Sequence, residues 1–330
     1  MAPLAMPAVE LRRNGLNLSG TALWLDATRK SELSFVSHAH SDHIARHERV
    51  IATAPTVKLM THRLGKIPSP LPAPYNRPFE LGPLVLELLP AGHMLGAAQL
   101  RVTRADGVRV TYSGDINFSP MLTAEPAQLA ECDTLILEST FGHPRYRFPP
   151  RDEVLASVEA WIRRCLDGGV APVLLCYPMG KSQEVMKHLS DRGYPLSAHA
   201  SVYEASRIYA ECGVSIRVRR FGGDYRPGEV LVFPPRIGRG SALAKVWPRQ
   251  TAVLTGWALD GPQIARRYGA DLAFPLSDHA DFEGLVRYAK ATGAGEVITH
   301  HGFARELADA LCAQGLDAHP LGAVKQLELF

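Results

Sequence analysis

The sequence predicts an α/β protein, and two observations support this fold class. Short runs of β-type apolar residues recur along the chain, and several of them end in a histidine or an aspartate. One such run, residues 173–176, is followed by Gly180 and Lys181, where we expect a helix to begin. A chain of 330 residues can bury a substantial core, as one large or two closely associated domains.

The composition is ordinary for a soluble globular protein, with 46% hydrophobic and 21% charged residues. No apolar run approaches the ~18 residues that cross a membrane, and the N-terminus lacks the pattern of a secretory signal. The five cysteines are scattered and form no CxxC pair, which indicates reduced thiols. We therefore expect a cytoplasmic protein with no membrane partner. The net charge of +3 does not by itself indicate nucleic acid.

A dense group of metal-ligand side chains follows the predicted strand 33–36. Six residues hold His38, His40, Asp42 and His43. Imidazole and carboxylate suit zinc, iron and manganese. In an extended loop His38 and His40 point to one side, whereas we expect Asp42 and His43 where the loop turns into a helix, facing a second point. The spacing predicts one metal for each pair, and the alternative is a cluster of solvated loop histidines.

Turn and strand patterns predict the secondary structure around this group. Asn14-Gly15 predicts a hairpin, and the run 21–25 predicts a strand that ends at Asp26. The proline-rich stretch 62–78 predicts an irregular surface loop. The strand 84–89 leads to His93, in a glycine-containing loop that lets the backbone approach a site closely.

Three further strands end in polar residues. Strands 99–104 and 108–112 turn at Asp106-Gly107, and the second of them leads to Asp115. The strand 134–137 ends at Glu138. A late strand ends in His300 and His301 followed by glycine.

The segment His38-Ala-His40-Ser-Asp42-His43 resembles the HxHxDH signature of the metallo-β-lactamase superfamily, and the later motifs occur in the family's order. The resemblance implies an αββα sandwich with two divalent ions, Zn²⁺ or Mn²⁺. The resemblance implies that each metal ion has three ligands of its own and that Asp115 bridges the two ions. Metal one would be bound by His38, His40 and His93, and metal two by Asp42, His43 and His301. The resemblance also implies that Asp26 orients the histidine loop, and it leaves His300 as the other candidate for the last ligand.

Three segments resemble motifs of the β-CASP and DNA cross-link repair nucleases within this superfamily. They are Glu138-Ser-Thr-Phe, Gly180-Lys181-Ser-Gln and Ser277-Asp-His279-Ala-Asp281. This resemblance implies a reduced β-CASP-like α/β module at 142–257, inserted between two parts of the metallo-β-lactamase domain at 1–141 and 258–330. Across nearly the whole chain the resemblance is strongest to bacterial DNA exonucleases whose genes accompany an ATP-dependent DNA ligase and a helicase.

The resemblance implies a metal-dependent DNA exonuclease that acts in DNA repair and hydrolyses phosphodiester bonds between two metals. Asp42 and Asp115 would serve the metals, and His279, oriented by Glu138, would hydrogen-bond a phosphate oxygen or protonate the leaving oxygen. Lys181, at a helix N-terminus, would hold a phosphate.

A basic segment supports a polyanionic partner. Between Arg217 and Arg249 eight basic residues face two acidic ones, a net charge of +6. Arg236 and Arg239 lie in a glycine-containing loop of a kind that follows a phosphate backbone. The alternative is a merely solvated basic surface.

Other functions remain open at this point. An RNA nuclease of the β-CASP branch uses the same metal cradle, and a thioester or lactone hydrolase is a more distant alternative. A catalytically inactive nucleic-acid-binding subunit is a third, although none of the ligand positions is missing here. The sequence does not decide between Zn²⁺ and Mn²⁺ or between 5′ and 3′ polarity.

Overall fold

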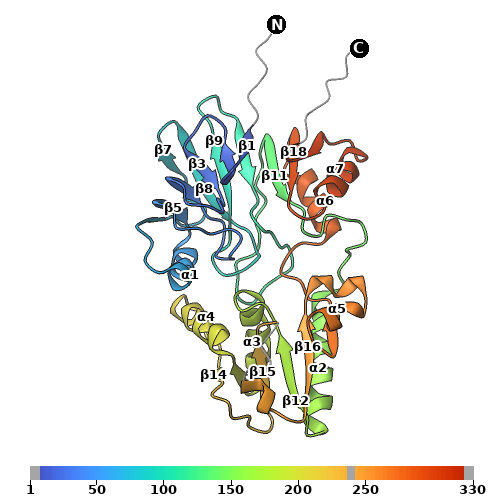
Figure 1. The fold of residues 1–330 in the computed structure, drawn as a ribbon. Helices are drawn as coiled ribbons and strands as arrows, with labels where there is room; N and C mark the ends of the chain where they lie inside the picture. The colour runs from blue at the N-terminus through green and yellow to red at the C-terminus, as the bar shows by residue number, and fades with distance from the viewer. Residues whose placement is uncertain (1–7, 236–241, 323–330) are drawn as a thin grey trace. The chain divides into compact units, whose positions relative to one another are not determined.

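The computed structural model describes residues 8–235 and 242–322. The chain forms two compact units (Figure 1). The first combines Met1–Phe118, Ala124–Arg147 and His279–Phe330, and the second combines Ser119–Thr123 with Phe148–Asp278. In the described part of the chain, no helix combines the length and apolar character needed to cross a membrane.

Two β-sheets form the frame of the first unit. The six-stranded sheet has the order β1 (Val9–Arg12), β2 (Gly15–Leu18), β3 (Leu23–Leu25), β4 (Leu33–Phe35), β5 (Arg49–Ala52) and β6 (Ser69–Pro72). The seven-stranded sheet has the order β19 (Ala318–Pro320), β18 (Glu296–His300), β11 (Thr134–Glu138), β10 (Arg109–Tyr112), β9 (Ala98–Thr103), β8 (Leu84–Pro90) and β7 (Phe79–Leu81). Strands β1 and β2 pair antiparallel, so the predicted hairpin is confirmed, although its turn residues are Arg13 and Asn14 and Gly15 already pairs with Arg12.

The alternation of side chains in β11 gives the first unit two cores. Ile136 packs in a core to which both sheets contribute, with Phe35 of β4 among its members. Its neighbours Leu135 and Leu137 point the other way and pack with α6 (Phe282–Ala291) and α7 (Ala304–Cys312). Figure 1 shows α6 and α7 beside β11 and β18. The two sheets therefore pack face to face, with helices on the outer face of the larger one.

Two local predictions in this unit are wrong. The proline-rich stretch 62–78 is not all loop, because α1 (Ala54–Leu64) extends into it and β6 pairs parallel with β5. β6 is the edge strand of its sheet, where the missing N–H groups of Pro70 and Pro72 are tolerated. No helix follows Asp42 either, because residues 44–48 are a short link into β5, which already pairs with β4 at Arg49.

The second unit is built on one parallel sheet. Its order is β14 (Arg219–Arg220), β13 (Leu196–Ala198), β15 (Val230–Phe233), β12 (Ala171–Leu175), β16 (Arg249–Leu254) and β17 (Leu272–Phe274). One face, with Leu174 and Val232, packs against α2 (Arg151–Asp167), α3 (Lys181–Asp191) and α4 (Ala200–Glu211). The opposite face, with Val173 and Leu231, packs against the short 3-10 helix Ala242–Lys245 and neighbouring loops.

Two features of this unit bear on the predictions. Helix α3 begins at Lys181, as predicted from the Gly180-Lys181 pattern. The unit continues past Trp257 to Asp278, because β17 pairs with β16 after the 3-10 helix Gly256–Asp260 and α5 (Gln263–Arg267). The compact unit therefore extends beyond the range 142–257 expected for an inserted module.

Candidate metal centre

Four buried side chains from three loops of the first unit meet at one point. They are His38 and His40 after β4, His93 after β8 and Asp115 after β10, and one ligand atom of each lies within 4.8 Å of the others. Nε2 of His38 lies 3.3 Å from Oδ2 of Asp115, and Nε2 of His93 lies 3.2 Å from Nδ1 of His40. The sheets thus bring together the residues predicted for metal one and for the bridge.

A glycine lets two of these loops approach each other. Gly114 precedes Asp115 and has a φ of +54°, a conformation that glycine adopts without strain. A Cβ atom at this position would lie 2.6 Å from the Cβ of Ser37, the residue before His38. Any larger residue at position 114 would push the loop that carries Asp115 away from the histidines.

The second group of predicted ligands lies next to the first. Nε2 of His43 lies 3.4 Å from Oδ2 of Asp115 and 3.7 Å from Oδ2 of Asp42. The His43 and His301 ring centroids are 5.7 Å apart. One carboxylate oxygen of Asp115 therefore faces both His38 and His43, which is the position that a bridging ligand requires. The Asp42 side chain is 70% exposed, so it lies on the open side of the centre.

His300 and His301 occupy different environments. His301 is exposed and has a φ of +61°, whereas His300 is buried and stacks on Tyr112 at 5.4 Å between ring centroids. Burial lowers the pKa of His300 well below its ordinary value. The assignment of His301 as the ligand stays a prediction, and its proximity to His43 supports it.

Asp26 contacts the loop that carries His38, His40 and His43, and it also contacts Tyr112 of β10. Its Oδ1 accepts the backbone N–H of Ser37 at 2.6 Å, and its Oδ2 accepts the hydroxyl groups of Ser37 and Tyr112 at 2.5 and 2.9 Å. The same Oδ2 lies 2.7 Å from Nδ1 of His43. Such a carboxylate fixes the direction of the histidine and the nitrogen that carries its proton. The sequence motifs do not single out Ser37 or Tyr112, whose only signal is proximity to His38 and Asp115.

The electrostatics of the centre favour an ionised Asp115. Burial alone raises the pKa of Asp115, but His43, His279 and His38 outweigh it and hold this pKa well below its usual range. Burial likewise acts to lower the pKa of His43, but the carboxylates of Asp115 and Asp26 outweigh it and raise that pKa well above the ordinary value. For His38, burial dominates and lowers the pKa well below the ordinary value.

These residues fit a divalent metal ion. Nε2 of His38 is buried and makes no hydrogen bond to any residue that the structure describes, although a buried polar atom normally has a partner. The atom lies among imidazole nitrogens and a carboxylate, which are donors that suit zinc and manganese.

His279 and Glu138 form a pair beside these ligands. Nδ1 of His279 lies 3.1 and 3.2 Å from the two carboxylate oxygens of Glu138. Glu138 is buried at the end of β11, and its Oε1 also accepts the backbone N–H of Ile116 at 2.7 Å. Nε2 of His279 lies 4.0 Å from Oδ2 of Asp115. Nδ1 of His279 thus faces Glu138 and Nε2 faces Asp115, while the role of the pair stays a prediction.

Lys181 lies in an ion pair within the second unit. Its Nζ is 2.9 Å from Oδ1 of Asp278, and the two side chains are 12% and 6% exposed. Asp278 directly precedes His279 in the chain. The phosphate-binding role of Lys181 stays a prediction, and its ammonium already has an anionic partner in this structure.

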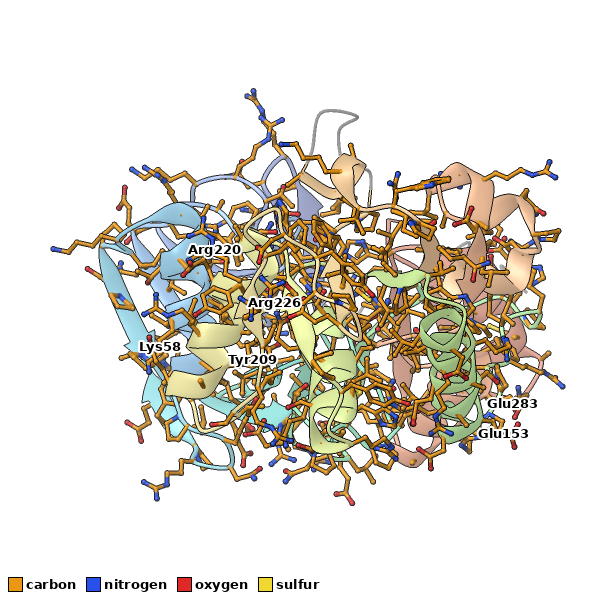
Figure 2. The ribbon with its side chains drawn as sticks, turned by 90° about the horizontal axis from the view of Figure 1, so that it is seen from below. Lys58, Glu153, Tyr209, Arg220, Arg226 and Glu283 are labelled. Atoms are coloured by element: carbon orange, nitrogen blue, oxygen red, sulfur yellow. The ribbon has the colours of Figure 1, made fainter. Side chains whose placement is uncertain are left out.

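The basic segment of the second unit is partly neutralised. Arg219 lies 2.6 Å from Glu229, and Arg249 donates to the carbonyls of Leu243 and Val246 at 3.3 and 2.9 Å. Arg220 and Arg226 are exposed, and Figure 2 shows them on the side of this unit away from Glu153 of α2. Arg236 and Arg239, the residues of this segment predicted to contact nucleic acid, lie outside the described residues.

Comparison with known proteins supports the family suggested by the motifs. No protein-family model matches the chain. The chain is 36% identical over 318 residues to a probable DNA ligase of Opitutus terrae, covering 96% of this chain and 31% of that protein. It is 27% identical over 313 residues to the DNA cross-link repair protein SNM1 of Arabidopsis thaliana, covering 85% and 64% of the two chains. The chain therefore spans less than two thirds of either relative.

One solved structure shows the same fold. A protein of unknown function from Enterococcus faecalis superimposes with a TM-score of 0.60 at 13% identity, over 88% of this chain and 79% of that one. The fold and the histidine–aspartate centre define a metallo-β-lactamase-type protein. The chain belongs to the metallo-β-lactamase-fold nucleases of the β-CASP and DNA cross-link repair branch.

Proposed function

We propose that this protein is a metal-dependent DNA exonuclease that hydrolyses phosphodiester bonds and acts in DNA repair. The observation that carries this proposal is the position of Oδ2 of Asp115, 3.3 Å from His38, 3.4 Å from His43 and 4.0 Å from His279. One carboxylate thus faces both predicted metal positions and the predicted acid. A simple ester hydrolase on this fold has no evident use for the His279–Glu138 pair.

In this mechanism the chain would hold two ions, Zn²⁺ or Mn²⁺. His38, His40 and His93 would hold the first, Asp42, His43 and His301 the second, and Asp115 both. Bound metal lowers the pKa of an attacking water and polarises the scissile phosphate. Asp26 keeps Nε2 of His43 directed to the centre by binding its Nδ1.

His279 supplies the proton in the proposed reaction. Glu138 accepts the N–H at Nδ1 of His279. When the ring is protonated, Nε2 carries a second N–H, which it donates to a phosphate oxygen or gives up to the leaving oxygen. Glu138 is itself held by the backbone N–H groups of Ile116 and Thr140, at 2.7 and 3.3 Å. The histidine ring is thereby oriented before substrate binds, and proton transfer of this kind contributes about 10²–10⁴-fold.

Two finer assignments belong to the same proposal. We assign the first unit to an αββα metallo-β-lactamase sandwich and the second to a reduced β-CASP-like insertion. The parallel sheet of the second unit and its place between two segments of the first support this assignment. We also propose a functional association with an ATP-dependent DNA ligase, supported by the relative named a probable DNA ligase. Association with a helicase rests on the resemblance alone.

The proposal is tested with purified protein, Mn²⁺ or Zn²⁺, and matched DNA and RNA strands in linear and circular form. Degradation of linear DNA, with circular DNA intact, is the expected result, and Asp115→Asn serves as the inactive control. Cleavage of RNA with DNA untouched would move the protein to the RNA-processing nucleases. Hydrolysis of small esters, with both polymers intact, would identify an ester hydrolase.

A further inference from the structure

Helix α1 contacts both histidine loops of the metal centre. At its N-terminal end the hydroxyls of Thr53 and Thr56 donate to the carbonyl of Gly96 at 2.6 and 2.9 Å. Gly96 lies in the loop that carries His93. At its C-terminal end, Nη1 of Arg63 donates to the carbonyl of Ala39 at 3.2 Å, and Ala39 stands between the ligands His38 and His40. The guanidinium of Arg63 is therefore fixed at the edge of the centre.

The surface around Arg63 is basic. The sequence contains no acidic residue between Glu48 and Glu80. Arg46, Arg63 and Lys66 are all exposed, and a Cβ atom at Gly65, the C-cap of α1, would lie 3.9 Å from Nη2 of Arg46. In the described ranges 8–235 and 242–322, none of these three cations lies within 4.0 Å of a carboxylate. The same helix carries Lys58, labelled in Figure 2.

We propose that Arg63, together with Arg46 and Lys66, binds the phosphate backbone of the DNA strand next to the scissile phosphate. This inference rests on the proposed function, and it assigns a DNA contact to the first unit. A guanidinium has five N–H donors, so the single bond to Ala39 leaves others for a phosphate in the fork geometry that arginine favours. Arg46 and Lys66 add positive charge beside it, for the next phosphates of the strand.

The alternative role for these cations is structural, because positive charge near the C-terminal end of a helix interacts favourably with its dipole. The two roles differ in their salt dependence. A residue that contacts a phosphate contributes to the slope of log affinity against log salt concentration, about 0.7 per phosphate of a single strand. A residue that only stabilises α1 changes the melting temperature and leaves this slope unchanged.

The test measures binding of fluorescent single-stranded DNA by anisotropy from low to high salt, with EDTA present so that no cleavage occurs. Four proteins are compared: the wild type, Arg63→Met, Arg63→Lys, and the triple variant Arg46→Gln/Arg63→Met/Lys66→Gln. Arg13→Met is the matched control, an exposed arginine of the same unit. Metal content and melting temperature are measured for every protein, so that a damaged centre or helix is recognised.

We expect Arg63→Met to lower the salt slope by about 0.7 and the triple variant by about 2. Arg63→Lys should retain most of the slope, and Arg13→Met all of it. A triple variant with full metal content and the wild-type slope would overturn the inference. If the wild type binds DNA through these residues but cleaves none when metal is restored, the surface is supported and the proposed nuclease function is wrong.

Discussion

The Oγ atom of Ser37 lies 2.5 Å from Oδ2 of Asp26 and 2.9 Å from Nδ1 of His38, in the buried interior of the first unit. A hydroxyl has one proton, so if it donates to the carboxylate it accepts from the N–H at Nδ1 of His38. Nε2 of His38 is then the nitrogen with a lone pair, and it faces Asp115 at 3.3 Å. Ser37 thus transmits the orientation set by Asp26 to His38, whereas His43 contacts Asp26 directly.

Loss of this hydroxyl should weaken metal binding. We predict that Ser37→Ala lowers the affinity for Zn²⁺ or Mn²⁺ by about 10–100-fold, the usual effect of removing an outer partner of a ligand histidine. Ser37→Thr retains the hydroxyl and should bind nearly as well as the wild type. Isothermal titration of the metal-free proteins measures this.

Ser34→Ala is the matched control for that comparison. Ser34 is also buried, on β4, and its hydroxyl donates to the carbonyl of Phe35 at 3.0 Å without contacting a ligand histidine. An equal loss of metal affinity in Ser34→Ala and Ser37→Ala would show that general damage to β4 weakens the site, and not the loss of the Ser37 hydroxyl between Asp26 and His38.

Removal of His279 should separate catalysis from metal binding. We predict that His279→Ala lowers turnover by about 10²–10⁴-fold and keeps the wild-type metal content, because His279 acts on the substrate. Glu138→Gln should lower turnover less, since the amide still contacts Nδ1. Elemental analysis of the same samples used for kinetics provides the check, and parallel loss of metal and activity would contradict this role.

The ion pair between Lys181 and Asp278 offers a test of the role of Lys181. If the lysine mainly holds Asp278 in place, then Lys181→Met and Asp278→Asn should lower the stability of the protein by similar amounts. The double variant should be little less stable than either single variant. Breaking such a buried pair costs about 3 kcal/mol of stability, measured by urea unfolding. If Lys181 instead binds a phosphate, only Lys181→Met should lower the salt dependence of DNA binding.

The two adjacent histidines should differ in their effect on metal stoichiometry. We predict that His301→Ala loses one of two bound ions, as should Asp42→Ala. His300→Ala should keep both ions and instead lower the melting temperature, because His300 packs against Tyr112. Native mass spectrometry counts the ions, and loss of metal from His300→Ala alone would reverse the assignment.

The sequence predicted the parts of the fold that local patterns specify, and the residues it proposed for the metal site lie together in the structure. Most of the strands that lead to site residues have strong β-type runs, and the ligand positions follow them in one order. The sequence did not predict β6, because its two prolines are typical of a loop although an edge strand tolerates them. It also did not predict the path after Asp42, because that path depends on the pairing of β4 with β5. Contacts made only in three dimensions, such as Tyr112 with Asp26 or Arg63 with Ala39, leave no pattern in one sequence.

The most direct test of the central proposal is a titration of metal-free protein with Mn²⁺ or Zn²⁺ while the degradation of end-labelled linear DNA is followed. We predict that the rate rises until two ions are bound per chain, that Asp115→Asn shows no such rise, and that the DNA shortens stepwise from one end. Full activity with one ion bound would contradict the two-metal centre. Intact DNA with both ions bound would contradict the nuclease itself.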